Sequence, residues 1–169
     1  MQYITHIQLN DRPGARELAQ VAAPEHKPMV SYELMEATLL GADRSGFESD
    51  DVAIADEAMA RIDDAIADAQ GVIDAHLLKR GYQIPFGQVP RLLTSLARAI
   101  VRYFLHKDRA NLDSDDTLVR DYKDAMKQLQ LIADGKISLG LQDELVETGL
   151  GMPQITKGSS RIRDALKGF

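Results

Sequence analysis

The sequence contains no cysteine and no tryptophan, and aromatic residues make up only 5% of its 169 positions. Without cysteine, the chain can form no disulfide, no thiolate zinc site and no cysteine nucleophile. The core must therefore be built mainly from Leu, Ile, Val, Ala and Met. No apolar run approaches the ~20 residues that span a bilayer, and the first residues lack the basic and apolar regions of a secretory signal. We expect a protein with an aliphatic core that neither enters a membrane nor is secreted.

The chain has more acidic than basic residues, and its charge is unevenly distributed along the sequence. The net charge is −6, but residues 151–169 contain four basic side chains and one acidic side chain, a net +3, which leaves −9 on residues 1–150. An acidic body repels the phosphate backbone, so the composition argues against general nucleic-acid binding. The basic end indicates a segment that can meet an acidic surface.

Apolar periodicity predicts an all-α fold. The clearest signal is a long amphipathic helix, in which small and apolar residues recur at i, i+3 and i+4 from Ala55 to Leu77. Ser49 or Asp50 is placed to cap its start, and Gly81 is placed to end it.

Two further long helices are expected after this one. The first begins near Pro90, which suits the first turn of a helix. The second follows a cap at Asp113 to Asp116 and stops at Gly135. Shorter helices are predicted at residues 14–23 and after Ser31.

The expected architecture is an antiparallel bundle of three long helices, with one or two short N-terminal helices and extended N- and C-terminal arms. Residues 1–13 are interpreted as extended and surface-lying. We expect a helical domain over residues 1–140, with its core at 49–140 and the N-terminal helices and loop at 14–48. Residues 141–169 form the extended basic arm.

No pattern of residues indicates catalysis. The sequence has no nucleophile elbow, no P-loop and no dinucleotide-binding glycine motif. The acidic loop after Asp43 fails the calcium pattern, because Phe47 stands where an oxygen ligand is required. The histidines include no metal-binding pair at i, i+4 spacing; they are His6, His26, His76 and His106. We therefore expect no enzyme, no catalytic or metal-binding residues and no cofactor.

Four arginines on the second long helix are spaced so that they lie along one line; they are Arg91, Arg98, Arg102 and Arg109. This arginine line is either a solvated face or a subunit interface, since arginine is enriched at interfaces. In the first case, it would pair with acidic residues of the preceding helix, such as Asp63, Asp64 or Asp68. Tyr82 and Phe86, in the extended turn before the helix, are further candidates for the interface.

Residues 151–169 have too little apolar content to fold alone. They are either a disordered end or an arm that becomes ordered on a partner. The candidate docking residues of this arm are Lys157, Arg161, Ile162, Arg163, Leu166 and Phe169.

Three blocks between Ala55 and Leu141 carry a more specific pattern. The first block is Ile73-Asp74-Ala75-His76-Leu77, followed by Gly81-Tyr82-Gln83-Ile84-Pro85. The second is Val89-Pro90-Arg91-Leu92-Leu93 with the later pair Arg102-Tyr103. The third is Tyr122-Lys123-Asp124-Ala125, followed by Gly135-Lys136-Ile137-Ser138-Leu139-Gly140. In this order, the blocks resemble a family encoded among the head genes of Mu-like phages and prophages.

The resemblance implies a structural head–tail connector, also called an adaptor or neck protein. Such subunits would form a homo-oligomeric ring, dodecameric by expectation, between the portal protein and the tail or a second neck protein. DNA would pass through as a non-specific passenger, in the neck of a virion assembled in the host cytoplasm. The alternatives are a tail-completion or scaffolding protein, and a helical nucleic-acid-binding regulator that uses the arginine line.

Overall fold

The computed structural model describes residues 2–107 and 116–141, and within these ranges every regular element is helical. The elements in chain order are α1 (His6–Leu9), the π-type turn η1 (Asn10–Gly14), α2 (Ala15–Ala22), α3 (Tyr32–Leu40), α4 (Ser49–Arg80), α5 (Arg91–His106) and α6 (Thr117–Ala133). The predicted all-α class is confirmed.

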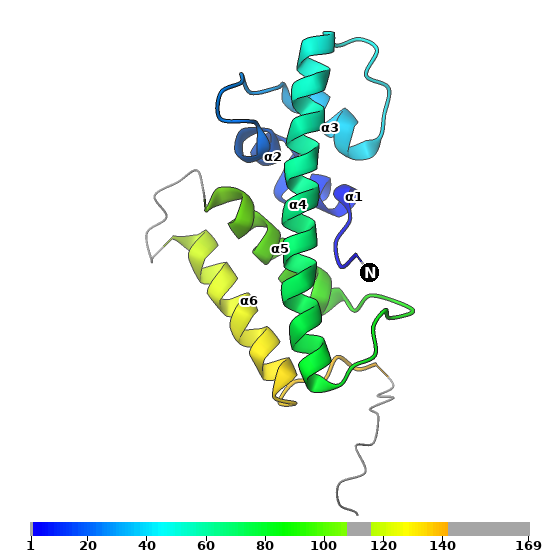
Figure 1. The fold of residues 1–169 in the computed structure, drawn as a ribbon, viewed down its shortest axis with the longest axis vertical. Coiled ribbons are helices and arrows are strands. Elements are labelled where there is room, and N and C mark those ends of the chain that lie inside the picture. The colour runs from blue at the N-terminus through cyan, green and yellow to red at the C-terminus, as the bar shows by residue number, and fades with distance from the viewer. Residues whose placement is uncertain (1, 108–115, 142–169) are drawn as a thin grey trace, which may run out of the picture.

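The 32-residue helix α4 is the axis of the molecule (Figure 1). Helices α5 and α6 pack on its C-terminal half and on each other, and successive long helices run in opposite directions. Helices α2 and α3 pack against its N-terminal half. The predicted antiparallel bundle of three long helices with shorter N-terminal helices is therefore confirmed.

Local sequence signals set most of the helix ends. The side chains of Ser31 and Asp116 accept hydrogen bonds from backbone N–H groups in the first turns of α3 and α6. Gly41 and Gly81 end α3 and α4 in the left-handed conformation, with φ of 64° and 94°. The start of α4 differs by one residue from the prediction, because Glu48 rather than Ser49 or Asp50 takes the extended capping position.

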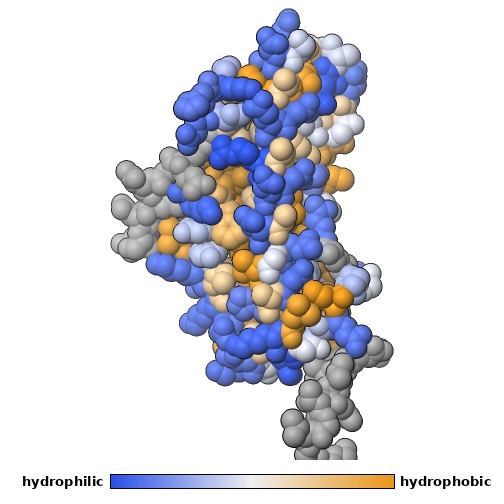
Figure 2. All heavy atoms as spheres, viewed as in Figure 1, coloured by the Kyte–Doolittle hydropathy of each residue, from blue (hydrophilic) through white to orange (hydrophobic). Residues whose placement is uncertain are grey.

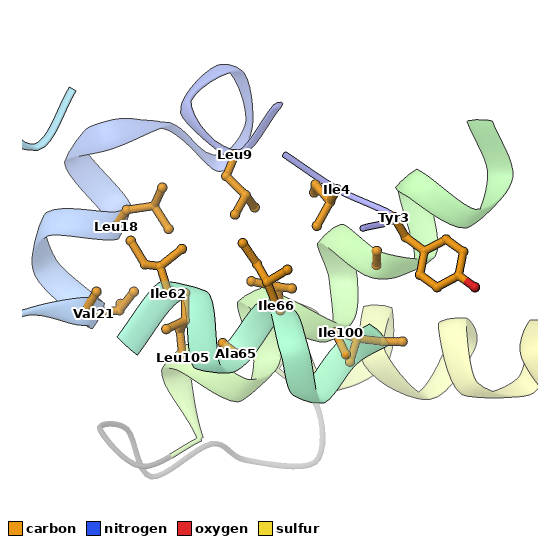
Figure 3. Packing of buried hydrophobic residues seen from close by; sticks show 14 of the residues in the cluster. Tyr3, Ile4, Leu9, Leu18, Val21, Ile62, Ala65, Ile66, Ile100 and Leu105 are labelled. Atoms are coloured by element: carbon orange, nitrogen blue, oxygen red, sulfur yellow. The ribbon is translucent and has the colours of Figure 1, made fainter. Parts of the chain in front are cut away.

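One continuous core joins the three long helices to the N-terminal ones. Its fully buried side chains come from each of the helices α1 to α6 and include Leu9, Leu18, Leu34, Ile62, Ile73, Leu77, Leu93, Ile100, Leu129 and Ile132. Figure 3 shows Leu9 and Leu18 packed toward Ile62 and Ile66 of α4. No polar or charged residue is buried within the described ranges, so burial of aliphatic surface is the dominant stabilising contribution.

The N-terminal stretch departs from the prediction. Tyr3, Ile4 and Leu9 are 2%, 1% and 0% exposed, so residues 2–13 are not a surface-lying extended arm. The short helix α1 begins with a reciprocal capping box between Thr5 and Gln8. A single helical turn is too short to show the 3.6-residue periodicity on which the sequence interpretation depended. Residues 142–169 of the predicted C-terminal arm lie outside the described residues.

Candidate subunit interface

Helix α5 places the arginine line along one side, outside its stripe of buried residues. Arg91 is exposed, and Arg98 and Arg102 are half-buried. Arg109 lies outside the described residues. The first three positions of the predicted line therefore do share one side of α5, but their environments differ.

Arg102 is held by an acidic residue of the same chain. Its Nε and Nη2 donate to the two carboxylate oxygens of Glu17 in α2, at 2.8 and 2.9 Å. Nε2 of His106 lies 3.1 Å from the same carboxylate. Burial opposes ionisation of Glu17, but the hydrogen bonds from Arg102 and His106 outweigh it and lower the pKa of the carboxyl group. This bidentate pair fastens α2 to α5 and occupies Arg102 within the chain.

Arg91 and Arg98 have no carboxylate partner of this kind. The Nε of Arg98 donates to the backbone carbonyl oxygen of Arg12 at 3.2 Å, and neither arginine forms one of the ion pairs between described residues. Both line a groove of about 410 Å³ with polar side chains of the N-terminal stretch and of α5, namely Gln2, Thr5, Gln8, Asp11, Thr94 and Ser95. This groove is polar and open, and it carries two basic side chains against the single carboxylate of Asp11.

Four acidic residues of α4 pair with partners other than the arginine line. Asp63 lies 2.6 Å from Nε2 of His6, and Asp74 accepts a hydrogen bond from the hydroxyl group of Tyr3. Further along the helix, Arg44 pairs with Asp56 and Lys27 with Glu57, both at 2.5 Å. Within the arginine line, Arg102 thus pairs with Glu17 of α2, whereas Asp63 of the preceding helix pairs with α1.

Asp64 and Asp68 are the acidic side chains in the middle of α4 that take part in none of the ion pairs between described residues. They border a groove of about 160 Å³ that Arg61 and Lys107 also line. Arg61 donates to the backbone oxygen of Ala23, and Lys107 lies over the ring of Phe104. This groove therefore carries two acidic and two basic side chains, and Asp64 and Asp68 are its side chains with negative charge.

The turn between α4 and α5 holds the predicted aromatic candidates. Tyr82 is only 6% exposed, and its hydroxyl oxygen accepts a hydrogen bond from the backbone N–H of Leu139. Phe86 is half-buried and packs edge-to-face on Tyr82, with ring centroids 6.1 Å apart. Tyr82 therefore fixes the segment after α6, while Phe86 keeps part of its ring accessible.

The described residues contain neither a cluster of metal ligands nor a membrane-spanning helix. No group of three or more His, Asp or Glu side chains there lies close enough to hold a metal ion. None of the helices in this part of the chain combines the length and the apolar character needed to cross a membrane. The candidate docking residues of the basic arm, from Lys157 to Phe169, fall outside the described ranges.

Comparison with known proteins gives two matches. The family model described as "Bacteriophage Mu, Gp36" matches residues 3–154, which include every helix from α1 to α6. The chain is also 39% identical over 112 residues to the Mu-like prophage FluMu protein gp36 of Haemophilus influenzae. That alignment covers 65% of this chain and 76% of the prophage protein.

Proposed function

Because this chain belongs to the Bacteriophage Mu Gp36 family, we propose that it is a structural protein of a Mu-like phage, a subunit of the connector that joins head to tail. The family match over residues 3–154 carries this proposal. The all-helical body and its charged surface grooves support it, because a connector needs a stable subunit with several contact surfaces rather than a reaction centre.

In this proposal, copies of the chain form a ring, dodecameric by expectation, between the portal protein and the tail or a second neck protein. DNA passes through the ring without being held. The charge of −9 on residues 1–150 supports this role, because an acidic wall repels phosphates and prevents tight contacts with the passing duplex. The basic residues 151–169 supply the contact with the portal protein or with a neighbouring subunit.

The rival interpretation is a helical regulator that binds nucleic acid through the arginine line. The pairing of Arg102 with Glu17 disfavours it, because this guanidinium is neutralised inside the chain and is not free for phosphate. A mobility-shift titration of the purified protein with duplex DNA at low salt separates the two functions. We expect no stable complex, whereas a complex that dissociates as salt is added would favour the regulator.

A genetic experiment tests the connector role directly. Removing this gene from an inducible prophage should yield DNA-filled heads and complete tails that do not join, and a plasmid copy of the gene should restore joining. Aberrant or absent heads after removal would instead indicate a scaffolding protein. Fully joined, infectious particles would overturn the proposal.

A further inference from the structure

The outward side of α4 is lined by small residues. Ala53, Ala60 and Ala67 follow one another at intervals of seven residues, two helical turns, and all are exposed. Gly71 continues the line four residues later and is also exposed. In Figure 2, this side of α4 is a column of pale orange and blue spheres, in which small apolar and hydrophilic residues alternate.

Gly71 has no explanation within the single chain. It lies in the middle of a 32-residue helix, where glycine is about 1 kcal/mol less favourable than alanine. A methyl group placed on its Cα would meet no atom within 4 Å, so the chain's own packing does not require glycine there. A close approach by a second molecule would require it.

On α5, two positively charged side chains lie beside a small polar residue. Ser95 lies between Arg91 and Arg98 on one side of the helix, at the i, i+4 and i+7 positions. Thr94 and Ser95 are small polar residues that leave the space between the two guanidinium groups open. On α4, in the same way, Asp64 and Asp68 border the small residues around Gly71.

We propose that the α4 face around Gly71 of one subunit packs against the α5 face around Ser95 of the next subunit. Asp64 and Asp68 then pair with Arg91 and Arg98 across the interface, and the small residues let the two helices approach closely. The occupant of each face is a second copy of this chain, because each copy carries both charge-complementary faces.

This interface is heterologous, which is the kind that builds rings. The groove beside Asp64 and Asp68 and the groove beside Arg91 and Arg98 share no lining residue, so one subunit can hold a neighbour at each. A contact between two different faces repeats around a ring until it closes. The inference rests on the proposed function, in that it names the contact by which a connector ring would assemble.

Disulfide cross-linking tests the contact directly, because the chain has no native cysteine. We expect the double variant Ala67→Cys with Ser95→Cys, which keeps Gly71 and changes exposed positions only, to form, on mild oxidation at high protein concentration, a ladder of dimers, trimers and larger species on a non-reducing gel. Each single variant is the control and can give dimers at most. A double variant that forms no species larger than a dimer would overturn the interface.

Charge reversal shows whether the predicted pairs hold this contact. Adding Arg91→Glu and Arg98→Glu to the double-cysteine chain should reduce the yield of the ladder about tenfold, because carboxylates then face Asp64 and Asp68. Adding Asp64→Arg and Asp68→Arg to that variant should restore it. The matched control, Lys123→Glu with Lys127→Glu on the exposed side of α6, changes the net charge equally and should leave the ladder intact. An equal loss in this control would contradict the pairing.

The outcome is separable from that of the proposed function. If the chain is found in the neck of the particle but gives no ladder, the connector role is supported and this interface is contradicted. If the chain gives the ladder but is absent from the neck, the interface is supported and the connector role is contradicted.

Discussion

At the scale of single residues, Glu17 joins helix α2 to helix α5, which lies far from it in the sequence. It binds Arg102 in a bidentate pair and contacts His106, and the three side chains are each less than one-third exposed. The spacing of the arginines predicted that Arg91, Arg98 and Arg102 share one side of a helix. The partner of Arg102 was not predictable, because it lies 85 residues earlier and helical periodicity carries no information about distant contacts.

The substitution Glu17→Gln should lower the free energy of unfolding at neutral pH by about 1–2 kcal/mol, since it removes a partly buried, charge-assisted pair. The pKa of Glu17 is lower in the folded chain than in the unfolded chain. Its contribution is therefore complete above the unfolded pKa, about 4.3, and is lost as the pH falls through the folded pKa. Denaturation curves of both proteins from neutral to acidic pH measure this.

The matched control for that series is Glu25→Gln, which changes an exposed carboxylate outside the helices and should leave the unfolding free energy nearly unchanged. The difference between the wild-type chain and Glu17→Gln should shrink below about pH 4. A difference that stays constant into acid would show that the ionised carboxylate is not the source of the effect.

Gly135, just after α6, is a second residue with a defined physical requirement. Its φ is +74°, and an added Cβ would lie 3.1 Å from both Nε and Cζ of Arg80. The substitution Gly135→Ala should therefore cost more than the roughly 1–2 kcal/mol of the left-handed backbone alone, because Arg80 must also move. Gly81→Ala, at φ +94° with open space around it, is the control for the backbone cost. Equal losses in thermal denaturation would show that Arg80 does not constrain this position.

At the scale of elements, the long helices and most of the caps were predictable, whereas the cap at the start of α4 and the first helix were not. Ser31, Asp116, Gly41 and Gly81 act at the ends where their side-chain or backbone preferences indicate. The N-terminal stretch was mispredicted because one turn of helix and three buried residues give no periodic signal. Its attachment is specific. Burial and the hydrogen bond to Asp74 raise the pKa of Tyr3, which keeps its hydroxyl group protonated as a donor.

Two isoleucines of this stretch test its packing. Ile4 is 1% exposed and Ile7 is 65% exposed, although they are three residues apart. Ile4→Ala should lower the unfolding free energy by about 2–5 kcal/mol through loss of buried surface and creation of a cavity. Ile7→Ala should change it by less than about 0.5 kcal/mol. Equal effects in urea denaturation would mean that residues 1–13 do not pack as described.

Substitution of Gly71 tests whether this glycine is needed for the packing of α4 inside the subunit. Gly71→Ala should raise the unfolding free energy of the isolated subunit by about 1 kcal/mol, because it improves helix propensity and meets no neighbouring atom. Ala67→Gly, one turn earlier on the same exposed side, is the reciprocal control and should lower it by a similar amount. A lower melting temperature for Gly71→Ala would indicate a role for this glycine inside the subunit.

At the scale of the whole molecule, the all-α class and the antiparallel bundle could be predicted, because amphipathic periodicity extends over three long segments. It could not be predicted that the N-terminal helices and the long bundle share one core, since this depends on contacts between distant segments, such as that of α2 with α4. The surfaces were predictable only in part. The arginine line was recognised from its spacing, but the unpaired Asp64 and Asp68 emerge only when the partners of the other acidic residues are known.

Deleting residues 151–169 should abolish binding to the portal protein and leave folding unchanged. The buried core extends from Tyr3 to Ile132, so the shortened chain should keep its helical spectrum and its melting temperature. It should no longer bind the portal protein, because the basic segment is the proposed docking arm. Pull-down of portal protein by tagged full-length and shortened chains measures this. Unchanged binding would refute the docking role.

The most direct measurement of the connector role is an electron cryomicroscopy map of purified Mu-like particles that encode this chain. The account predicts a closed ring at the head–tail junction, in which each subunit fits α4, α5 and α6 in the arrangement described above. A junction built without this chain, or finished particles from which it is absent, would contradict the account.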